Sequence, residues 1–118
     1  MAQQIKIKRI YDDYAKEDGY RVLIDRLWPR GVKKEDAHID QWLKDFAPTY
    51  DLRKWFNHQP ERFDRFKALY REELEAKKEP IEEFLKNNKE KKITLLYGAK
   101  DETHNHALVL QDYLKKIK

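Results

Sequence analysis

One short stretch of the chain carries apolar residues on both faces of an extended segment. Residues 92–97 read Lys-Ile-Thr-Leu-Leu-Tyr, a composition typical of a buried strand. Because both faces are apolar, we expect this strand to lie at the centre of a sheet that is covered on both sides. The rest of the chain must then supply its neighbouring strands and the helices that cover them.

Two further strands are predicted in the N-terminal quarter. Residues 5–10 alternate apolar and basic side chains, which is typical of a strand near a sheet edge with one buried face. Residues 20–27 form the second strand, and Pro29 ends regular structure there because it has no backbone donor. The polar connection at 11–19 is short for a parallel crossover. Its length therefore favours an antiparallel pair.

Apolar residues recur at helical spacing in the later segments. The predicted helices span residues 36–46, a short stretch after Thr49, residues 60–77, a stretch after Pro80, and residues 103–117. In the first of them, Ile39, Trp42, Leu43 and Phe46 fall on one face. Thr49 is expected to cap the second helix, and Pro60 suits the first turn of the third.

The composition sets limits on the class of protein. A chain of 118 residues is long enough for a single domain, 1–118, and the net charge of +4 is compatible with an anionic ligand or nucleic acid. The lack of cysteine excludes disulfides and thiolate catalysis. The N-terminus lacks the apolar core of a signal peptide, and no apolar run reaches the roughly 20 residues of a membrane span. We therefore expect a cytoplasmic protein with no membrane partner.

The turn that follows the second strand is the first candidate site. It carries Asp25, Arg26, Trp28 and Arg30, with Lys33 a little further on. Arginine suits bidentate contact with carboxylate or phosphate, and tryptophan offers a face for stacking. The structural alternative is that the charges pair with neighbouring chain while the tryptophan fills the core.

The loop at 98–106 is the second candidate, because it joins the buried strand to the N-terminus of a helix, where anions are favoured. Lys100 offers a positive charge, and Asp101 and either His104 or His106 are candidates for proton transfer. Asn105 is a ligand-binding candidate. Alternatively, Asp101 and Asn105 only cap the helix.

A third group lies near the end of the short helix. It contains Arg53, Lys54, Trp55 and His58, of which Arg53 and Trp55 resemble pieces of a nucleic-acid or nucleotide surface. The favoured interpretation is that Trp55 is core and the cations are solvated, since amphipathic helices normally look like this. His58 is retained as a ligand-binding candidate.

No metal site is predicted. His104 and His106 are two residues apart, so on a helix they project to opposite sides. No recognised ligand spacing is present, and the sequence identifies no cofactor.

Several separated motifs resemble one family. They are Asp18-Gly-Tyr-Arg-Val-Leu-Ile-Asp-Arg-Leu-Trp-Pro-Arg-Gly-Val-Lys-Lys, Ala47-Pro-Thr, Leu52-Arg-Lys-Trp-Phe-Asn-His, Thr94-Leu-Leu-Tyr-Gly-Ala-Lys-Asp and His104-Asn-His-Ala. Together they resemble the YeaO-like family, a branch of the DUF488 superfamily, whose domain has no assigned function. The resemblance covers nearly the whole chain. It implies a small α/β domain with a short, largely parallel sheet of about three strands flanked by about five helices.

The resemblance also bears on the site. With parallel strands, Asp25, Arg26 and Arg30 would lie near the loop at 98–106, at the carboxyl ends where open α/β sheets bind ligands. The wider superfamily often carries a Cys-His-Arg cluster in the segment that here reads Tyr97 to His106. Any thiol chemistry of those relatives therefore does not transfer.

Three functional classes stay open. The first is a small enzyme or binding protein in which Arg26, Arg30 and Lys100 hold a small anion while Asp25, Asp101 or His104 handles protons. The second is a nucleic-acid-binding module, which the acidic residues spread along the helices disfavour. The third is a non-catalytic interaction protein. The sequence does not indicate the oligomeric state.

Overall fold

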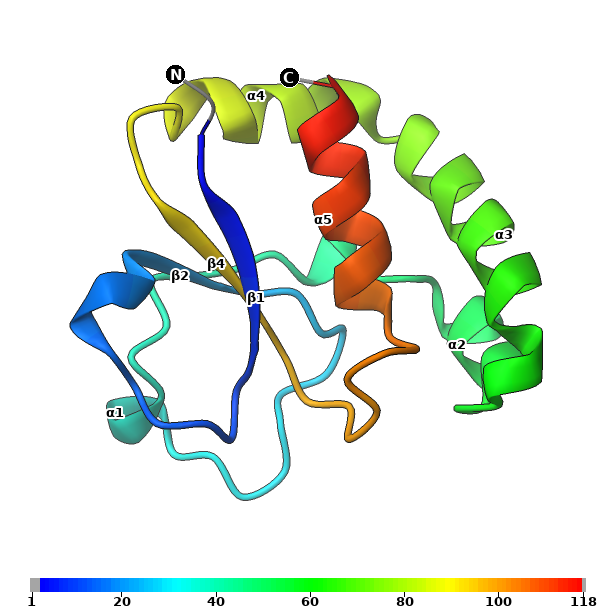
Figure 1. Ribbon diagram of the computed structural model, residues 1–118, viewed down its shortest axis with the longest axis horizontal. Coiled ribbons are helices and arrows are strands. Elements are labelled where there is room, and N and C mark those ends of the chain that lie inside the picture. The colour runs from blue at the N-terminus through cyan, green and yellow to red at the C-terminus, as the bar shows by residue number, and fades with distance from the viewer. Residues whose placement is uncertain (1–2, 118) are drawn as a thin grey trace.

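The computed structural model describes residues 3–117 and contains a four-stranded sheet in the order β1-β4-β2-β3 (Figure 1). The strands are β1 (Ile5–Arg9), β2 (Tyr20–Leu23), β3 (Gln41–Trp42) and β4 (Ile93–Tyr97). All five residues of β4 are buried, and this strand pairs with both β1 and β2. The prediction of a central strand at 92–97 is confirmed, as is the edge position of the first strand.

Every strand pairing in the described sheet is parallel. The α/β class and the parallel sheet implied by the family resemblance are confirmed, and the antiparallel pair favoured by loop length is wrong. The connection from β1 to β2 crosses β4 with only one 3₁₀ turn, η1 (Lys16–Asp18). This crossover can be short because buried polar contacts hold it against the sheet.

The helix predicted over residues 36–46 is wrong. A single turn, α1 (Lys34–Ala37), ends at His38, which has a left-handed φ of 51°. The chain then forms β3 beside β2, with Leu43 N donating to the Leu23 carbonyl at 2.8 Å. A short 3₁₀ turn, η2 (Lys44–Phe46), follows. Pairing with the open edge of β2 outweighs the helical spacing of the apolar residues, so the sheet has four strands and not three.

The other helices pack on one face of the sheet (Figure 1). They are α2 (Tyr50–Phe56), η3 (Pro60–Arg62), α3 (Phe63–Glu75), α4 (Lys78–Asn87) and α5 (His106–Ile117). Thr49 caps α2 as predicted, since its Oγ1 accepts a hydrogen bond from Leu52 N at 3.3 Å. Trp55 was expected in the core, but it is 40% exposed, with the Arg62 guanidinium over its ring. No helix within residues 3–117 is long and apolar enough to cross a bilayer.

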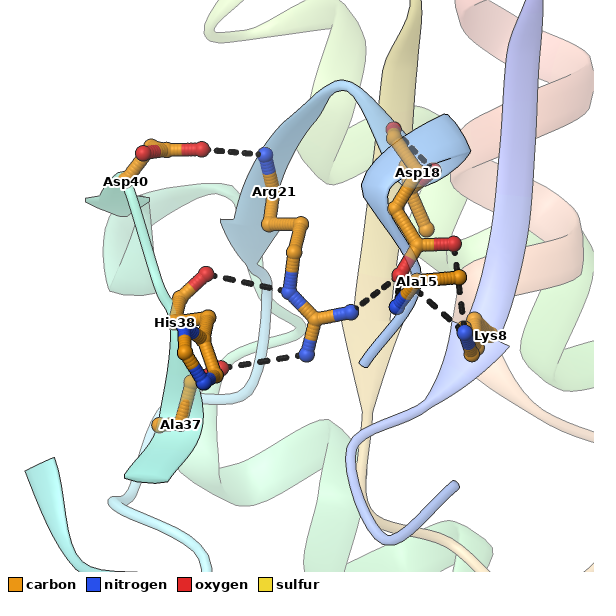
Figure 2. A network of polar contacts seen from close by, with 8 residues as sticks. Lys8, Ala15, Asp18, Arg21, Ala37, His38 and Asp40 are labelled. Atoms are coloured by element: carbon orange, nitrogen blue, oxygen red, sulfur yellow. Dashed lines mark hydrogen bonds and ion pairs between the residues drawn. The ribbon is translucent and has the colours of Figure 1, made fainter. Parts of the chain in front are cut away.

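The opposite face of the sheet has no long helix. A second apolar cluster of Ile10, Leu23, Ala37 and Leu96 lies there, beside a polar network (Figure 2). Arg21 on β2 is 2% exposed and donates to the carbonyls of His38 and Ala37, both at 3.0 Å. It also forms an ion pair with Asp18, which Lys8 contacts at 3.0 Å. The network thus ties β1, β2 and the segment after α1 together.

The protonation of Asp18 follows from this network. Burial alone would raise the pKa of Asp18, but hydrogen bonds from the Ala15 backbone, Lys8 and Arg21 outweigh it and lower the pKa. Asp18 is therefore charged at neutral pH, and Arg21 has a full counter-charge inside the protein.

Candidate functional site

A groove of about 550 Å³ opens at the carboxyl ends of β2 and β4. It is lined by Tyr11, Asp25, Leu27, Trp28, Pro29, Arg30, Arg53, His58, Gly98, Ala99, Lys100 and Asp101. Two inner cavities of about 70 and 80 Å³ adjoin it, and Arg53, His58 and Ala99 line all three spaces. The groove therefore has an open outer part and a narrow inner part.

Asp25 joins the two strand ends that form the base of the groove. Its Oδ2 accepts a hydrogen bond from Gly98 N at 2.9 Å. A Cβ atom on residue 98 would lie 2.9 Å from the same oxygen, so any larger residue would force the Asp25 carboxylate to shift. Asp25 is thus fixed by the neighbouring strand before any ligand arrives.

His106, the first residue of α5, lies beside this carboxylate. Its Nε2 is 3.0 Å from the Ile24 carbonyl and 3.2 Å from Asp25 Oδ1. The carbonyl can only accept, so Nε2 carries the proton. Asp25 Oδ1 is buried and has no hydrogen-bond partner among the described residues, which means that the imidazole contact is electrostatic. Full protonation of His106 would make the contact an ion pair.

Asp101 organises the turn before α5. Its Oδ1 accepts hydrogen bonds from Thr103 N at 2.9 Å and His104 N at 3.0 Å. The Thr103 backbone bond is the main reason that the pKa of Asp101 lies below its ordinary value. His104 Nδ1 lies 3.0 Å from Asp101 Oδ2, so both side chains are engaged with each other.

Asn105 is the N-cap of α5. Its Oδ1 accepts from Leu108 N at 3.1 Å, and its Nδ2 donates to the Asp101 carbonyl at 2.9 Å. The capping alternative therefore accounts for this residue. It also explains why α5 begins at His106, three residues later than predicted.

Two residues of the turn after β2 already donate side-chain hydrogen bonds to backbone carbonyls of the protein. Arg26 donates through Nε to the Pro48 carbonyl at 3.0 Å and through Nη2 to the Ala47 carbonyl at 3.2 Å. Trp28 donates to the Val32 carbonyl at 2.7 Å and packs edge-on against Trp42. Arg26 thus anchors the segment before α2 while it lines the inner cavity of 80 Å³.

Three other cations of the groove form no such side-chain contacts with the described residues. The side chains of Arg30, Arg53 and Lys100 are exposed and make no hydrogen bond, ion pair or ring contact with any residue in 3–117. His58 joins them in the groove from the end of α2. It is held at a left-handed φ of 53°, directly after Asn57 at 46°. Such backbone is uncommon for residues other than glycine.

The nine residues predicted to form a site all line one of the three adjoining spaces. Asp25, Trp28, Arg30, His58, Lys100 and Asp101 line the outer groove, Arg26 lines one inner cavity, and His104 and Asn105 line the other. Lys33 and Lys54 line none of them. The parallel pairing of β2 with β4 brings the two predicted loops together.

Sequence reasoning undervalued three residues. Arg53 was interpreted as a solvated cation, yet it lines all three spaces. His106 was predicted as an alternative to His104 for proton transfer, but its contact with Asp25 was not predicted. Leu27 was assigned to a strand, although it is 62% exposed on the groove wall. The proximity of Arg53 to His58 in sequence was the available signal. No group of three or more His, Asp or Glu side chains within residues 3–117 is arranged to hold a metal ion.

Comparison with known proteins places the chain in a family. The family model described as the inactive DUF488-N3 subclade matches residues 4–117. The uncharacterized protein YeaO of Escherichia coli K12 is 42% identical over 113 residues, which is 96% of this chain and 98% of that protein. The chain belongs to the YeaO-like DUF488 family. The resemblance seen in the motifs is confirmed.

Further relatives of the chain come from mycobacteria. The uncharacterized proteins Rv3073c of Mycobacterium tuberculosis H37Rv and Mb3100c of Mycobacterium bovis are each 39% identical over 111 residues. The match covers 94% of this chain and 93% of each relative. No solved structure is significantly similar to the chain.

Proposed function

We propose that the groove and its inner cavities bind a small anion that carries phosphate or carboxylate. The observation that carries the proposal is the convergence of three unpartnered cations, Arg30, Arg53 and Lys100, on one groove at the strand ends. Ligands of open α/β sheets bind at this position. Arginine is suited to hold phosphate or carboxylate through paired hydrogen bonds.

The backbone of His58 supports the same proposal. A left-handed residue with a Cβ costs about 1–2 kcal/mol, and such conformations cluster at ligand sites when the surrounding structure enforces them. His58 lines the groove together with Arg53.

Binding without turnover fits the groups available for proton transfer. Asp25 accepts from Gly98 N, and Asp101 accepts from two backbone amides and contacts His104. Each carboxylate therefore already forms hydrogen bonds that stabilise the fold. The family description as inactive agrees with a binding protein.

Calorimetric titration with inorganic phosphate and with acetate at low ionic strength tests the proposal. Arg53→Ala should weaken binding by about tenfold or more, since a hydrogen bond to a charged group contributes about 1.5–3 kcal/mol. Lys54→Ala is the matched control, because it removes the adjacent positive charge outside the groove, and it should change affinity little.

Equal effects of the two substitutions would contradict the proposal. A single-stranded oligonucleotide provides the competing test. Tight oligonucleotide binding that falls steeply with salt, without binding of the small anions, would favour a nucleic-acid-binding module instead.

A further inference from the structure

One wall of the outer groove has no role in the proposed binding of an anion. Tyr11, Leu27, Trp28 and Pro29 form it. Leu27 is 62% exposed and Tyr11 is 47% exposed, although both lie beside the charged lining. Ligand sites are usually apolar surfaces with a few placed polar groups, so this wall is suited to an organic body attached to the anion.

The wall presents flat surfaces in fixed positions. The Tyr11 hydroxyl donates to the Arg30 carbonyl at 2.9 Å, and the Arg9 guanidinium lies 5.2 Å from the Tyr11 ring centre. The Trp28 indole is held by its bond to the Val32 carbonyl. Rigid aromatic faces favour stacking with another planar ring.

The inner cavity of 80 Å³ has a different character. Arg26, Arg53, His58 and His106 line it together with the carboxylate of Asp25. Its volume is several times the roughly 10–15 Å³ that one water needs, so it has room for a group of a few heavy atoms. A phosphate group offers strong acceptor oxygens on several sides, which matches Arg53 and His58 from the end of α2 and the remaining Nη1 of Arg26 from the turn after β2.

We infer that the ligand is a phosphate monoester of a planar aromatic compound. The phosphate occupies the inner cavity between Arg53 and His58, and the ring lies against Leu27 and Trp28 in the outer groove. This inference rests on the proposed anion-binding function and specifies its ligand class.

Calorimetry with inorganic phosphate, glycerol phosphate and phenyl phosphate tests the inference on the full chain. Phenyl phosphate should bind about tenfold more tightly than inorganic phosphate, because the ring buries apolar surface. Glycerol phosphate should show little of this gain. Leu27→Ala should reduce the preference for phenyl phosphate several-fold and leave binding of inorganic phosphate unchanged.

Tyr50→Ala is the matched control, since Tyr50 is also 62% exposed but lies outside the groove, and it should preserve the preference. Equal affinity for the three probes overturns the aromatic ligand class and leaves the anion site intact. A preference that survives Leu27→Ala overturns the position of the ring. Failure of all three probes to bind overturns the phosphate ligand class, and failure of acetate as well overturns the proposed function itself.

Discussion

Two arginines of this protein illustrate opposite uses of the same side chain. Arg21 is 2% exposed, and its guanidinium is fully engaged with Asp18 and the carbonyls of Ala37 and His38. Arg53 is exposed and has no partner among residues 3–117, yet it lines every part of the groove. The first arginine is part of the fold, and the second is available to a ligand.

The difference follows from position in the sheet. Arg21 lies within β2, on the face that lacks a long helix, and its network lies beside the second apolar cluster of that face and contacts the short crossover through Asp18. Arg53 lies on α2, beyond the carboxyl ends of the strands. Charge in the first position must be paired because it is buried, whereas charge in the second position is solvated until a ligand displaces water.

Removal of Arg21 should have the largest effect on stability. We expect Arg21→Ala to lower the free energy of unfolding by about 3–5 kcal/mol, because Asp18 would be left as a buried charge with only Lys8 beside it. Urea denaturation measures this change. Arg53→Ala should stay within about 0.5 kcal/mol of the natural protein. Similar losses of stability in Arg21→Ala and Arg53→Ala would contradict the view that only Arg21 is part of the fold.

The same network predicts a dependence on acid. Because the folded pKa of Asp18 is lowered, its contribution is present above the unfolded pKa of about 3.9 and is lost as pH falls through the folded pKa. Asp18→Asn should therefore be destabilising by about 3 kcal/mol at pH 7. Unfolding measured from pH 7 to pH 2 should show the gap between variant and natural protein narrowing below about pH 4. A constant gap would mean that the charge of Asp18 is not what stabilises the network.

A substitution at the contact between Gly98 and Asp25 should have an intermediate effect on stability. Gly98→Ala should cost about 1–3 kcal/mol, because the added methyl group would overlap the Asp25 carboxylate. In an Asp25→Ala background the same change should cost less, since the clashing atom is gone. Chemical denaturation of the four proteins in this double-mutant cycle gives the coupling. Simple additivity would show that the two residues are not in the contact described.

Substitutions of the two left-handed residues after α2, Asn57 and His58, should have the smallest effects on stability. They also separate the effect of backbone conformation from that of the imidazole. His58→Gly relieves backbone strain but removes the imidazole, so stability should stay within about 1 kcal/mol while phosphate affinity falls several-fold. Asn57→Gly relieves strain in the same way and keeps the imidazole, so affinity should be retained. Thermal unfolding and phosphate titration of both variants measure this. Equal losses of affinity would indicate that loop geometry alone matters.

Much of the fold was predictable from local pattern. The buried strand β4, the apolar stripe of α3 and the Thr49 cap all follow from residue type and spacing, and each is confirmed. The segment 36–46 was predicted wrongly because its helical periodicity competes with the unpaired edge of β2, which only the assembled sheet reveals. The parallel crossover was missed for a related reason. The crossover contains no long helix, and polar contacts of Asp18 with Lys8 and Arg21 tie it to the neighbouring strands.

The candidate site was likewise predictable only in part. Charged residues directly after strands could be grouped correctly, since parallel strand ends meet at one edge. Arg53 could not be assigned from α2 alone, because an exposed cation on an amphipathic helix looks the same with or without a groove beside it. The capping role of Asn105 and the anchoring role of Arg26 also depend on partners distant in space or fixed by the turn.

The most direct test of the central claim is an amide and histidine-ring NMR titration of the protein with inorganic phosphate at low ionic strength. The account predicts saturable shifts at His58, at the amides of residues 98–101 and around Arg53, with Arg21 and His38 unmoved. Saturable shifts centred on the Arg21 network, or no saturable shift in the groove, would contradict it.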